Sequence, residues 1–297
     1  MQTRKAGTRR CLDLDLGVGE SPVWDAETGT LVFVDIIAPA LYRFHPEGGR
    51  LERWEMPEAI GSCGLTTDGR VVVALRTRVA LFDPATGRFE DLARPEPDRP
   101  GNRLNDGKVG PDGAFWVGSM DDSPEKGPNA ALYRIAPDGA ARQITDGLTT
   151  SNGLAWTADG RTMFHSDSRQ TVLWAWDFDP VTGEATNRRE LRRFAEAEGR
   201  PDGGAADVPG TYWSAGVSAG CLNRIGADGT LLGRIDLDIL APTMPCFGGE
   251  GLRTLYLTSL TTQRGGRSEK GGLYALTDGP GVAGAPVARF GAPQAKA

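Results

Sequence analysis

The sequence predicts an all-β chain folded as a six-bladed β-propeller, with four antiparallel strands in each blade. Two series of apolar segments support this prediction, because each recurs six times along the 297 residues. Starts in the first series are 40 to 50 residues apart, a period typical of propeller blades. The chain also holds 41 glycines and 20 prolines, as a fold with many short turns requires.

The first series combines a turn with a strand. Asp-Gly pairs precede three of its strands, and this pair favours tight hairpin turns because both residues tolerate positive φ. We expect these segments to form the same strand of successive blades. They are residues 29–35, 69–75, 113–118, 160–165, 210–214 and 252–257.

The second series interleaves with the first and has the apolar–polar alternation of half-buried strands. Its members are residues 41–44, 79–82, 132–135, 173–176, 222–225 and 273–276. Two independent series therefore give the same number of blades. We interpret the ambiguous segment 188–197 as an outer strand, because the repeat calls for one there.

Six such units nearly fill the chain, so we expect one propeller domain over residues 1–297. The ordered part should run from about 11 to 290, with flexible tails at 1–9 and 291–297. Residues 11–16 should form the strand that closes the ring by pairing with the last blade.

Composition excludes several classes of function. The chain has 33 basic and 39 acidic residues, a net charge of −6, which argues against nucleic acid or an anionic membrane as its main partner. No window approaches 18 apolar residues, and no apolar core of a signal peptide is present, so we expect a cytoplasmic protein without membrane spans. The oligomeric state is left open.

Histidine and cysteine are scarce. With only His45 and His165, a histidine-rich metal centre is impossible, and we expect both to be structural. The four cysteines are scattered without a CxxC pair and should be buried free thiols.

One repeated position carries polar side chains. Eight or nine residues before the turn glycine, four blades have an oxygen-bearing residue: Glu20, Asn105, Asn152 and Asp202. Innermost strands line a propeller's channel, so these side chains should converge. Such sequences also form ordinary turns, but four in phase favour a site for one divalent cation, Ca²⁺, Mg²⁺, Mn²⁺ or Zn²⁺.

Short motifs in a fixed order extend this pattern over almost the whole chain. They are residues 19–24 (GESPVW), 33–36 (FVDI), 103–108 (RLNDGK), 118–120 (GSM), 151–154 (SNGL), 187–189 (NRR), 201–203 (PDG) and 246–249 (CFGG). In these motifs the chain resembles the gluconolactonase and regucalcin family of sugar-lactone hydrolases. The resemblance implies a six-bladed propeller with one catalytic divalent metal ion.

The resemblance also implies roles for individual residues. Glu20, Asn152 and Asp202 match the family's metal ligands, and Arg103 and Asn105 match its substrate-binding residues. Regucalcin-like members carry a substrate-binding glutamate shortly after the Gly-x-Met segment. Here the aligned position is Ser123, and Asp122 is the candidate substitute.

The function expected on this basis is metal-dependent hydrolysis of a sugar lactone to the aldonic acid. Asp202 would be the general base for the attacking water. Two alternatives stay open: a metal-dependent lactonase or esterase for non-sugar lactones or phosphotriesters, and a calcium-binding regulatory or scaffold propeller without catalysis.

Overall fold

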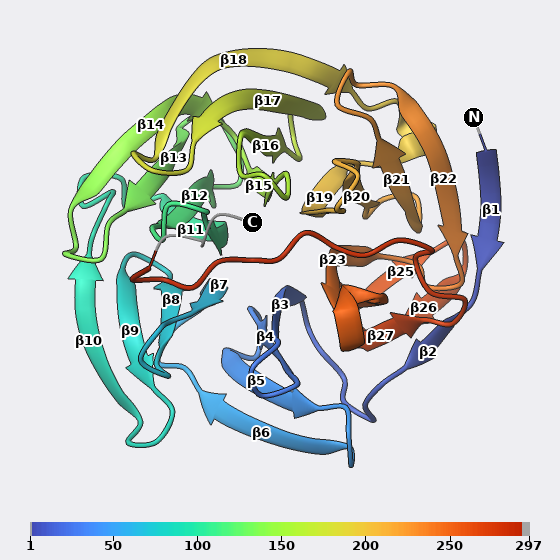
Figure 1. Ribbon diagram of the computed structural model, residues 1–297, viewed down its shortest axis with the longest axis horizontal. Helices are drawn as coiled ribbons and strands as arrows, with labels where there is room; N and C mark the ends of the chain where they lie inside the picture. Colours follow the sequence, from blue (N-terminus) through green and yellow to red (C-terminus); the bar gives the residue numbers. More distant parts are fainter. Residues whose placement is uncertain (1, 293–297) are drawn as a thin grey trace.

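The computed structural model describes residues 2–292, and in it six antiparallel sheets are arranged in a ring (Figure 1). This confirms the six-bladed propeller. Blade one consists of β3 (Gly19–Asp25), β4 (Thr30–Asp35), β5 (Ala40–His45) and β6 (Arg50–Glu55). Blade two consists of β7 (Ile60–Leu65), β8 (Val71–Leu75), β9 (Val79–Asp83) and β10 (Arg88–Ala93). Blade three consists of β11 (Asn102–Val109), β12 (Phe115–Asp121), β13 (Ala130–Ile135) and β14 (Ala141–Leu148).

The second half of the ring repeats this order. Blade four consists of β15 (Ser151–Trp156), β16 (Thr162–Asp167), β17 (Val172–Asp179) and β18 (Glu184–Arg193). Blade five consists of β19 (Pro201–Ala206), β20 (Tyr212–Gly216), β21 (Cys221–Ile225) and β22 (Leu231–Leu237). Blade six consists of β23 (Pro242–Gly248), β24 (Thr254–Ser259), β27 (Leu273–Leu276) and the N-terminal strand β2 (Thr8–Arg10).

The two series of segments seen in the sequence are the second and third strands of each blade. The segment interpreted as an outer strand forms β18 as far as Arg193 and is followed by the 3-10 turn η1 (Glu196–Glu198). Two elements were not expected: the hairpin of β25 (Thr262–Arg264) and β26 (Arg267–Glu269), and the 3-10 turn η2 (Glu250–Leu252). Among the residues that the structure describes, no helix is long and apolar enough to span a membrane.

The expectation for the N-terminus was wrong in its detail. The ring closes on the last blade, as expected, but the closing strand is β2, which pairs with β27. Residues 11–16, the strand that we expected, contribute only an isolated bridge at Leu16. Strand β1 (Gln2–Ala6) pairs in parallel with β22 at the outer edge of blade five, so residues 2–6 are not a flexible tail. Of the second expected tail, residues 293–297 lie outside the described part of the chain.

Large apolar side chains fill the space between neighbouring blades. Trp116 of blade three meets Trp156 and Phe178 of blade four in edge-to-face contacts with centroids 5.9 and 5.4 Å apart. Trp213 of blade five meets Phe247 of blade six in the same way. These contacts fix the orientation of adjacent blades, and thereby the relative positions of the inner strands.

After β27 the chain crosses the middle of the ring (Figure 1). We call residues 277–292 the C-terminal strap. Its backbone bonds to the last residues of inner strands: Ala285 donates to Ala206 of β19 at 2.9 Å, and Phe290 donates to Leu65 of β7 at 2.8 Å. The strap therefore covers the end of the channel at which the inner strands finish, so that access to the channel lies at the other end.

Phe290→Ala should destabilise the protein by about 3–5 kcal/mol, the usual cost of truncating a buried aromatic side chain. Phe290 is 4% exposed and packs in the core of blades two and three. Val287→Ala in the same strap is the control. Because Val287 is 39% exposed, its truncation should lower the free energy of unfolding by less than about 1 kcal/mol. Urea unfolding measures both, and equal small effects would show that the strap is not part of the cooperative fold.

Candidate metal and substrate site

Glu20, Asn105, Asn152 and Asp202 lie near the starts of four inner strands, β3, β11, β15 and β19. At each of these places the pairing with the second strand shifts register: between Glu20 and Val23, Leu104 and Gly107, Asn152 and Ala155, and Pro201 and Gly204. A β-bulge bends the strand and re-aims its side chains. The repeated bulge is thus the local device that positions a polar residue in each of these four blades.

The backbone next to two of these residues adopts left-handed conformations. Ser21, after Glu20, has a φ of 48°, and its hydroxyl accepts from the Cys63 backbone N–H of the next blade at 2.9 Å. Gly153, after Asn152, has a φ of 64°, and a Cβ there would lie 2.3 Å from the hydroxyl oxygen of Tyr212. Glycine is therefore required at 153, and the bond to Ser21 holds a strained residue beside Glu20.

A pocket of about 190 Å³ lies at the start of the inner strands, at the end of the channel opposite the C-terminal strap. It brings together the metal and substrate-binding candidates. Its lining includes Glu20, Arg103, Asn105, Asn152 and Asp202. These residues come from four different blades. The other polar lining residues are Lys126, Thr150, Ser168, Arg169 and Arg200.

Arg103 and Asn105 form one unit. The guanidinium Nη1 of Arg103 donates to the side-chain oxygen of Asn105 at 2.9 Å and to the carbonyl of Leu104 at 3.0 Å. Asn105 in turn donates to the carbonyl of Ser151 at 2.9 Å, in the next blade. Both polar atoms of the Asn105 side chain are thus engaged, and its amide holds the guanidinium at the pocket wall.

Asn152 and Asp202 are linked across the boundary of blades four and five. The Asn152 amide nitrogen donates to the hydroxyl of Ser168 at 2.8 Å, and that hydroxyl donates to the carbonyl of Pro201 at 2.6 Å. This leaves the side-chain oxygen of Asn152 as its free donor atom for a cation.

Three carboxylates share the channel: Glu20 and Asp106 are buried, and Asp202 is half-buried. Burial, followed by the charges of Asp202 and Asp106, raises the pKa of Glu20 well above its ordinary value. Burial and the charge of Asp106 raise the pKa of Asp202 to about 7. Asp106 itself is 2% exposed, and within residues 2–292 its Oδ1 has no hydrogen-bond partner. Concentrated negative charge of this kind favours binding of a cation.

Asp106 and Lys108 are members of this channel that the sequence did not single out. Lys108 is buried and donates to the carbonyl of Gly204 at 2.7 Å, and burial lowers its pKa. Both residues follow Asn105 in the motif RLNDGK. Its Asn-Asp-Gly segment fits an ordinary turn as well as a functional site, so it does not mark Asp106 or Lys108. The bulge in β11, which turns Asp106 inward, leaves no separate signal in the sequence.

Asp122 and Ser123 lie apart from the metal candidates. Asp122 binds Arg76 at 2.9 Å and lies 3.9 Å from Arg103. Asp122 does not line the pocket itself but is next to Arg103, which does. Ser123 instead lines a neighbouring cavity with Arg99, Asn102 and other residues.

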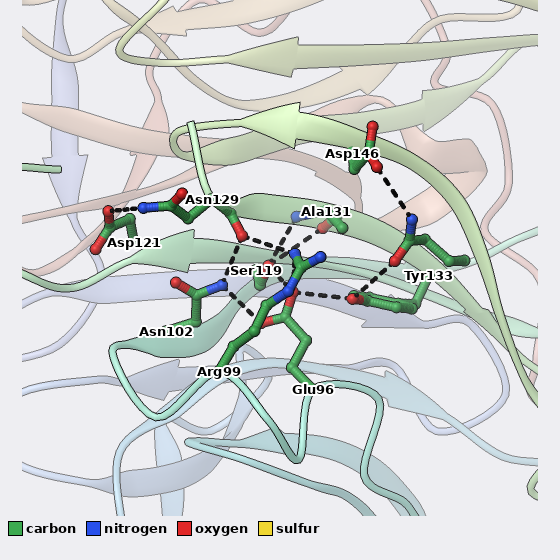
Figure 2. Close-up of polar contacts among 10 residues, drawn as sticks. Glu96, Arg99, Asn102, Ser119, Asp121, Asn129, Ala131, Tyr133 and Asp146 are labelled. Atoms are coloured by element: carbon green, nitrogen blue, oxygen red, sulfur yellow. Dashed lines mark hydrogen bonds and ion pairs between the residues drawn. The ribbon is translucent and has the colours of Figure 1, made fainter. Parts of the chain in front are cut away.

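Figure 2 shows the polar contacts beside this second cavity, among Glu96, Asn102, Asp121 and their partners. Glu96, on the loop before β11, accepts from Ser119, Asn102 and Tyr133 at 2.7, 3.0 and 3.0 Å. Asp121 accepts from the side chain of Asn129 at 3.0 Å and from the backbone of Ser123 at 2.9 Å. These bonds hold the start of β11, and so Arg103, while Ser123 is part of the adjacent loop.

Neither histidine lines the pocket. His45 is at the surface, where its Nε2 lies 2.6 Å from Glu52. His165 is fully buried, with Nε2 bonded to the hydroxyl of Ser151 at 2.8 Å. All four cysteines are free, and Cys63, Cys221 and Cys246 are buried as expected, whereas Cys11 near the surface is only half-buried.

His165 should make the protein sensitive to mild acid. Burial, with a smaller contribution from Arg188, lowers its pKa from 6.5 to about 3. The folded state therefore binds fewer protons than the unfolded state, and stability present above pH 6.5 is lost as the pH falls toward 3. When the pH falls from 7 to 5, the free energy of unfolding of the unmodified protein should drop by about 2 kcal/mol more than that of the His165→Asn variant. Urea unfolding of both proteins at both pH values measures this difference. Parallel losses in the two proteins would contradict this assignment.

The fold and the pocket together define a six-bladed propeller with a carboxylate-rich site at the open end of its channel. Residues 18–261 match the model of the "SMP-30/Gluconolactonase/LRE-like region". The chain therefore belongs to this family, as the motifs predicted.

Individual relatives agree with this assignment. The chain is 38% identical to 6-deoxy-6-sulfogluconolactonase of Pseudomonas putida, with 83% of this chain and 84% of that protein covered. It is 34% identical to regucalcin of Xenopus laevis, with 92% and 95% covered. Among solved structures, regucalcin of Agrobacterium tumefaciens, a calcium-binding protein, has a TM-score of 0.88 at 24% identity, covering 98% of this chain and 99% of that one, and so shares the fold.

Proposed function

We propose that the protein hydrolyses a sugar lactone to the aldonic acid with the help of one divalent metal ion. The observation that carries this proposal is the convergence of Glu20, Asn152 and Asp202, from three blades, in one pocket with Arg103. Membership of the gluconolactonase family supports the choice of a lactone. The name of one relative, 6-deoxy-6-sulfogluconolactonase, also specifies a sugar lactone as the substrate of that protein.

The residues present fit a divalent cation. The set of Glu20, Asn152 and Asp202 offers only oxygen donors, which suit Ca²⁺, Mg²⁺ and Mn²⁺, and carboxylates are also accepted by Zn²⁺. Within residues 2–292 no group of three or more His, Cys, Asp or Glu side chains is arranged as a metal cluster. The proposed ligand set consists of two carboxylates and one amide. The unpartnered Oδ1 of Asp106 adds negative charge nearby.

A divalent cation held there would polarise the lactone carbonyl and lower the pKa of an adjacent water. Asp202, as general base, takes a proton from the attacking water through a carboxylate oxygen. As the water oxygen bonds to the carbonyl carbon, Arg103 offers its donors to the developing oxyanion or to sugar hydroxyls. The ring C–O bond then breaks, and the proton returns from Asp202 to the ring oxygen, which leaves a hydroxyl and a carboxylic acid.

We also propose that the protein works in the cytoplasm. Four unpaired thiols in one chain fit a reducing compartment.

A substrate panel tests the proposed activity. Proton release should be measured on mixing the protein with aldonolactones, with simple non-sugar lactones and with a phosphotriester, each with and without added metal ion. Faster turnover of the aldonolactones is expected. Preference for the non-sugar esters would establish the alternative hydrolase, and no release with any compound would favour a calcium-binding or scaffold role.

A further inference from the structure

The pocket wall carries an excess of positive charge in an acidic protein. Four of its lining residues are cations, Arg103, Lys126, Arg169 and Arg200, against two acids, Glu20 and Asp202. The whole chain has a net charge of −6, so this gathering of cations runs against its overall balance. If a divalent cation offsets the two acids, the four positive side chains have no counterpart in the pocket lining.

Two of these four cations already have partners. Arg103 is bonded to Asn105 at 2.9 Å, and Lys126 donates to the carbonyl of Asp121 at 3.2 Å. Asp122 lies 3.9 Å from the first and 3.8 Å from the second. Their charges are therefore partly used within the protein.

Arg169 and Arg200 differ in this respect. Within residues 2–292 neither guanidinium forms a hydrogen bond or an ion pair, and both residues are exposed. Two other arginines of blade four do pair: Arg189 binds Asp177 at 2.8 Å, and Arg193 binds Glu190 at 2.7 Å. Two unpaired guanidinium groups at the mouth of a pocket are available to an external anion.

The backbone places these two arginines next to the metal candidates. Arg169 follows Ser168, whose hydroxyl joins Asn152 to the carbonyl of Pro201. Arg200 precedes Pro201 and Asp202, and its charge reaches the Asp202 carboxyl. The pair therefore straddles the boundary of blades four and five, beside the metal candidates Asn152 and Asp202.

We propose that the preferred lactone carries an anionic substituent, such as a sulfonate, phosphate or carboxylate, which Arg169 and Arg200 bind at the pocket mouth. This inference rests on the proposed function and narrows its substrate class. The planar donor fork of arginine matches each of these groups, and hydrogen bonds between two charged groups are the strong ones. A neutral sugar lactone would leave both guanidinium groups without a partner.

The test compares kcat/KM for glucono-1,5-lactone with that for analogues carrying phosphate, sulfonate or carboxylate at carbon 6. We expect at least one anionic lactone to be preferred about tenfold or more, the ratio that one charge-assisted hydrogen bond can supply. The analogue with the largest ratio identifies the anionic group. The preference should shrink when the salt concentration rises from about 0.02 to 0.5 M, because exposed charges are screened.

The Arg169→Ala/Arg200→Ala double variant should lose most of this preference. Its kcat/KM should fall more for the anionic lactone than for the neutral one. Arg88→Ala/Arg253→Ala, at two exposed positions outside the pocket lining, makes the same change in net charge and should keep the preference. Equal kcat/KM for neutral and anionic lactones, or an undiminished preference in the pocket variant, would overturn the inference and leave the lactonase intact. If none of the lactones is hydrolysed with any metal ion, the proposed function itself is wrong, and this inference falls with it.

Discussion

Asp202→Asn is expected to lower lactone hydrolysis by at least about 10²–10⁴-fold, the effect typical of losing a general base. The substitution keeps the shape of the side chain and removes both its proton acceptor and one negative charge from the proposed ligand set. Because burial and Asp106 raise the pKa of Asp202 to about 7, the variant also relieves charge repulsion in the channel. The fold should therefore remain intact, which circular dichroism and thermal unfolding can check.

Asp98→Asn is the matched control, since Asp98 is exposed on the loop before β11 and the change in charge is the same. It should retain activity. A well-folded Asp202→Asn protein with near-normal turnover at saturating metal would show that Asp202 is not the base.

Glu20→Gln should weaken metal binding more than the roughly 10–100-fold typical of losing an outer-shell partner of a metal site. A buried, charged oxygen ligand is lost, and an amide oxygen is a poorer donor to a hard cation. Calorimetric titration of chelator-treated protein measures the affinity directly. Unchanged affinity would remove Glu20 from the site.

Arg103→Ala provides the contrast. A guanidinium is always cationic and has no lone pair for a metal ion, so metal affinity should be nearly unchanged while catalysis falls. A rise in KM alone would mean that Arg103 binds ground state and transition state equally, and a fall in kcat as well would place it at the oxyanion. Loss of metal binding with intact hydrolysis at saturating metal would contradict our arrangement of the pocket.

The repeat determines how much of the fold can be predicted. Each blade must bury its faces against its neighbours, so second and third strands have strong apolar patterns that are visible in the sequence. The edge strands β1 and β2 have no such pattern, because residues 2–10 are mostly polar and join the sheets mainly through backbone pairing. For the same reason neither the parallel pairing of β1 nor the C-terminal strap could be foreseen.

The site could be predicted where its residues occupy a repeated position. Glu20, Asn105, Asn152 and Asp202 are in phase with the turns, and the bulges that aim them recur in the same place. Arg169 and Arg200 lie outside the inner strands, at the end of a hairpin and in a connection between blades, where repeat phasing gives no information. Ser123 was placed by the family resemblance alone, and the hydrogen bonds around Asp121 show why its loop is directed to the neighbouring cavity.

The most direct test of the account is a titration of chelator-treated protein with a divalent metal ion while proton release from an aldonolactone is recorded. We predict negligible hydrolysis without metal, followed by a linear rise that ends at one equivalent of metal per chain. Full activity in the protein stripped of metal would contradict the central claim that Glu20, Asn152 and Asp202 hold the ion on which hydrolysis depends.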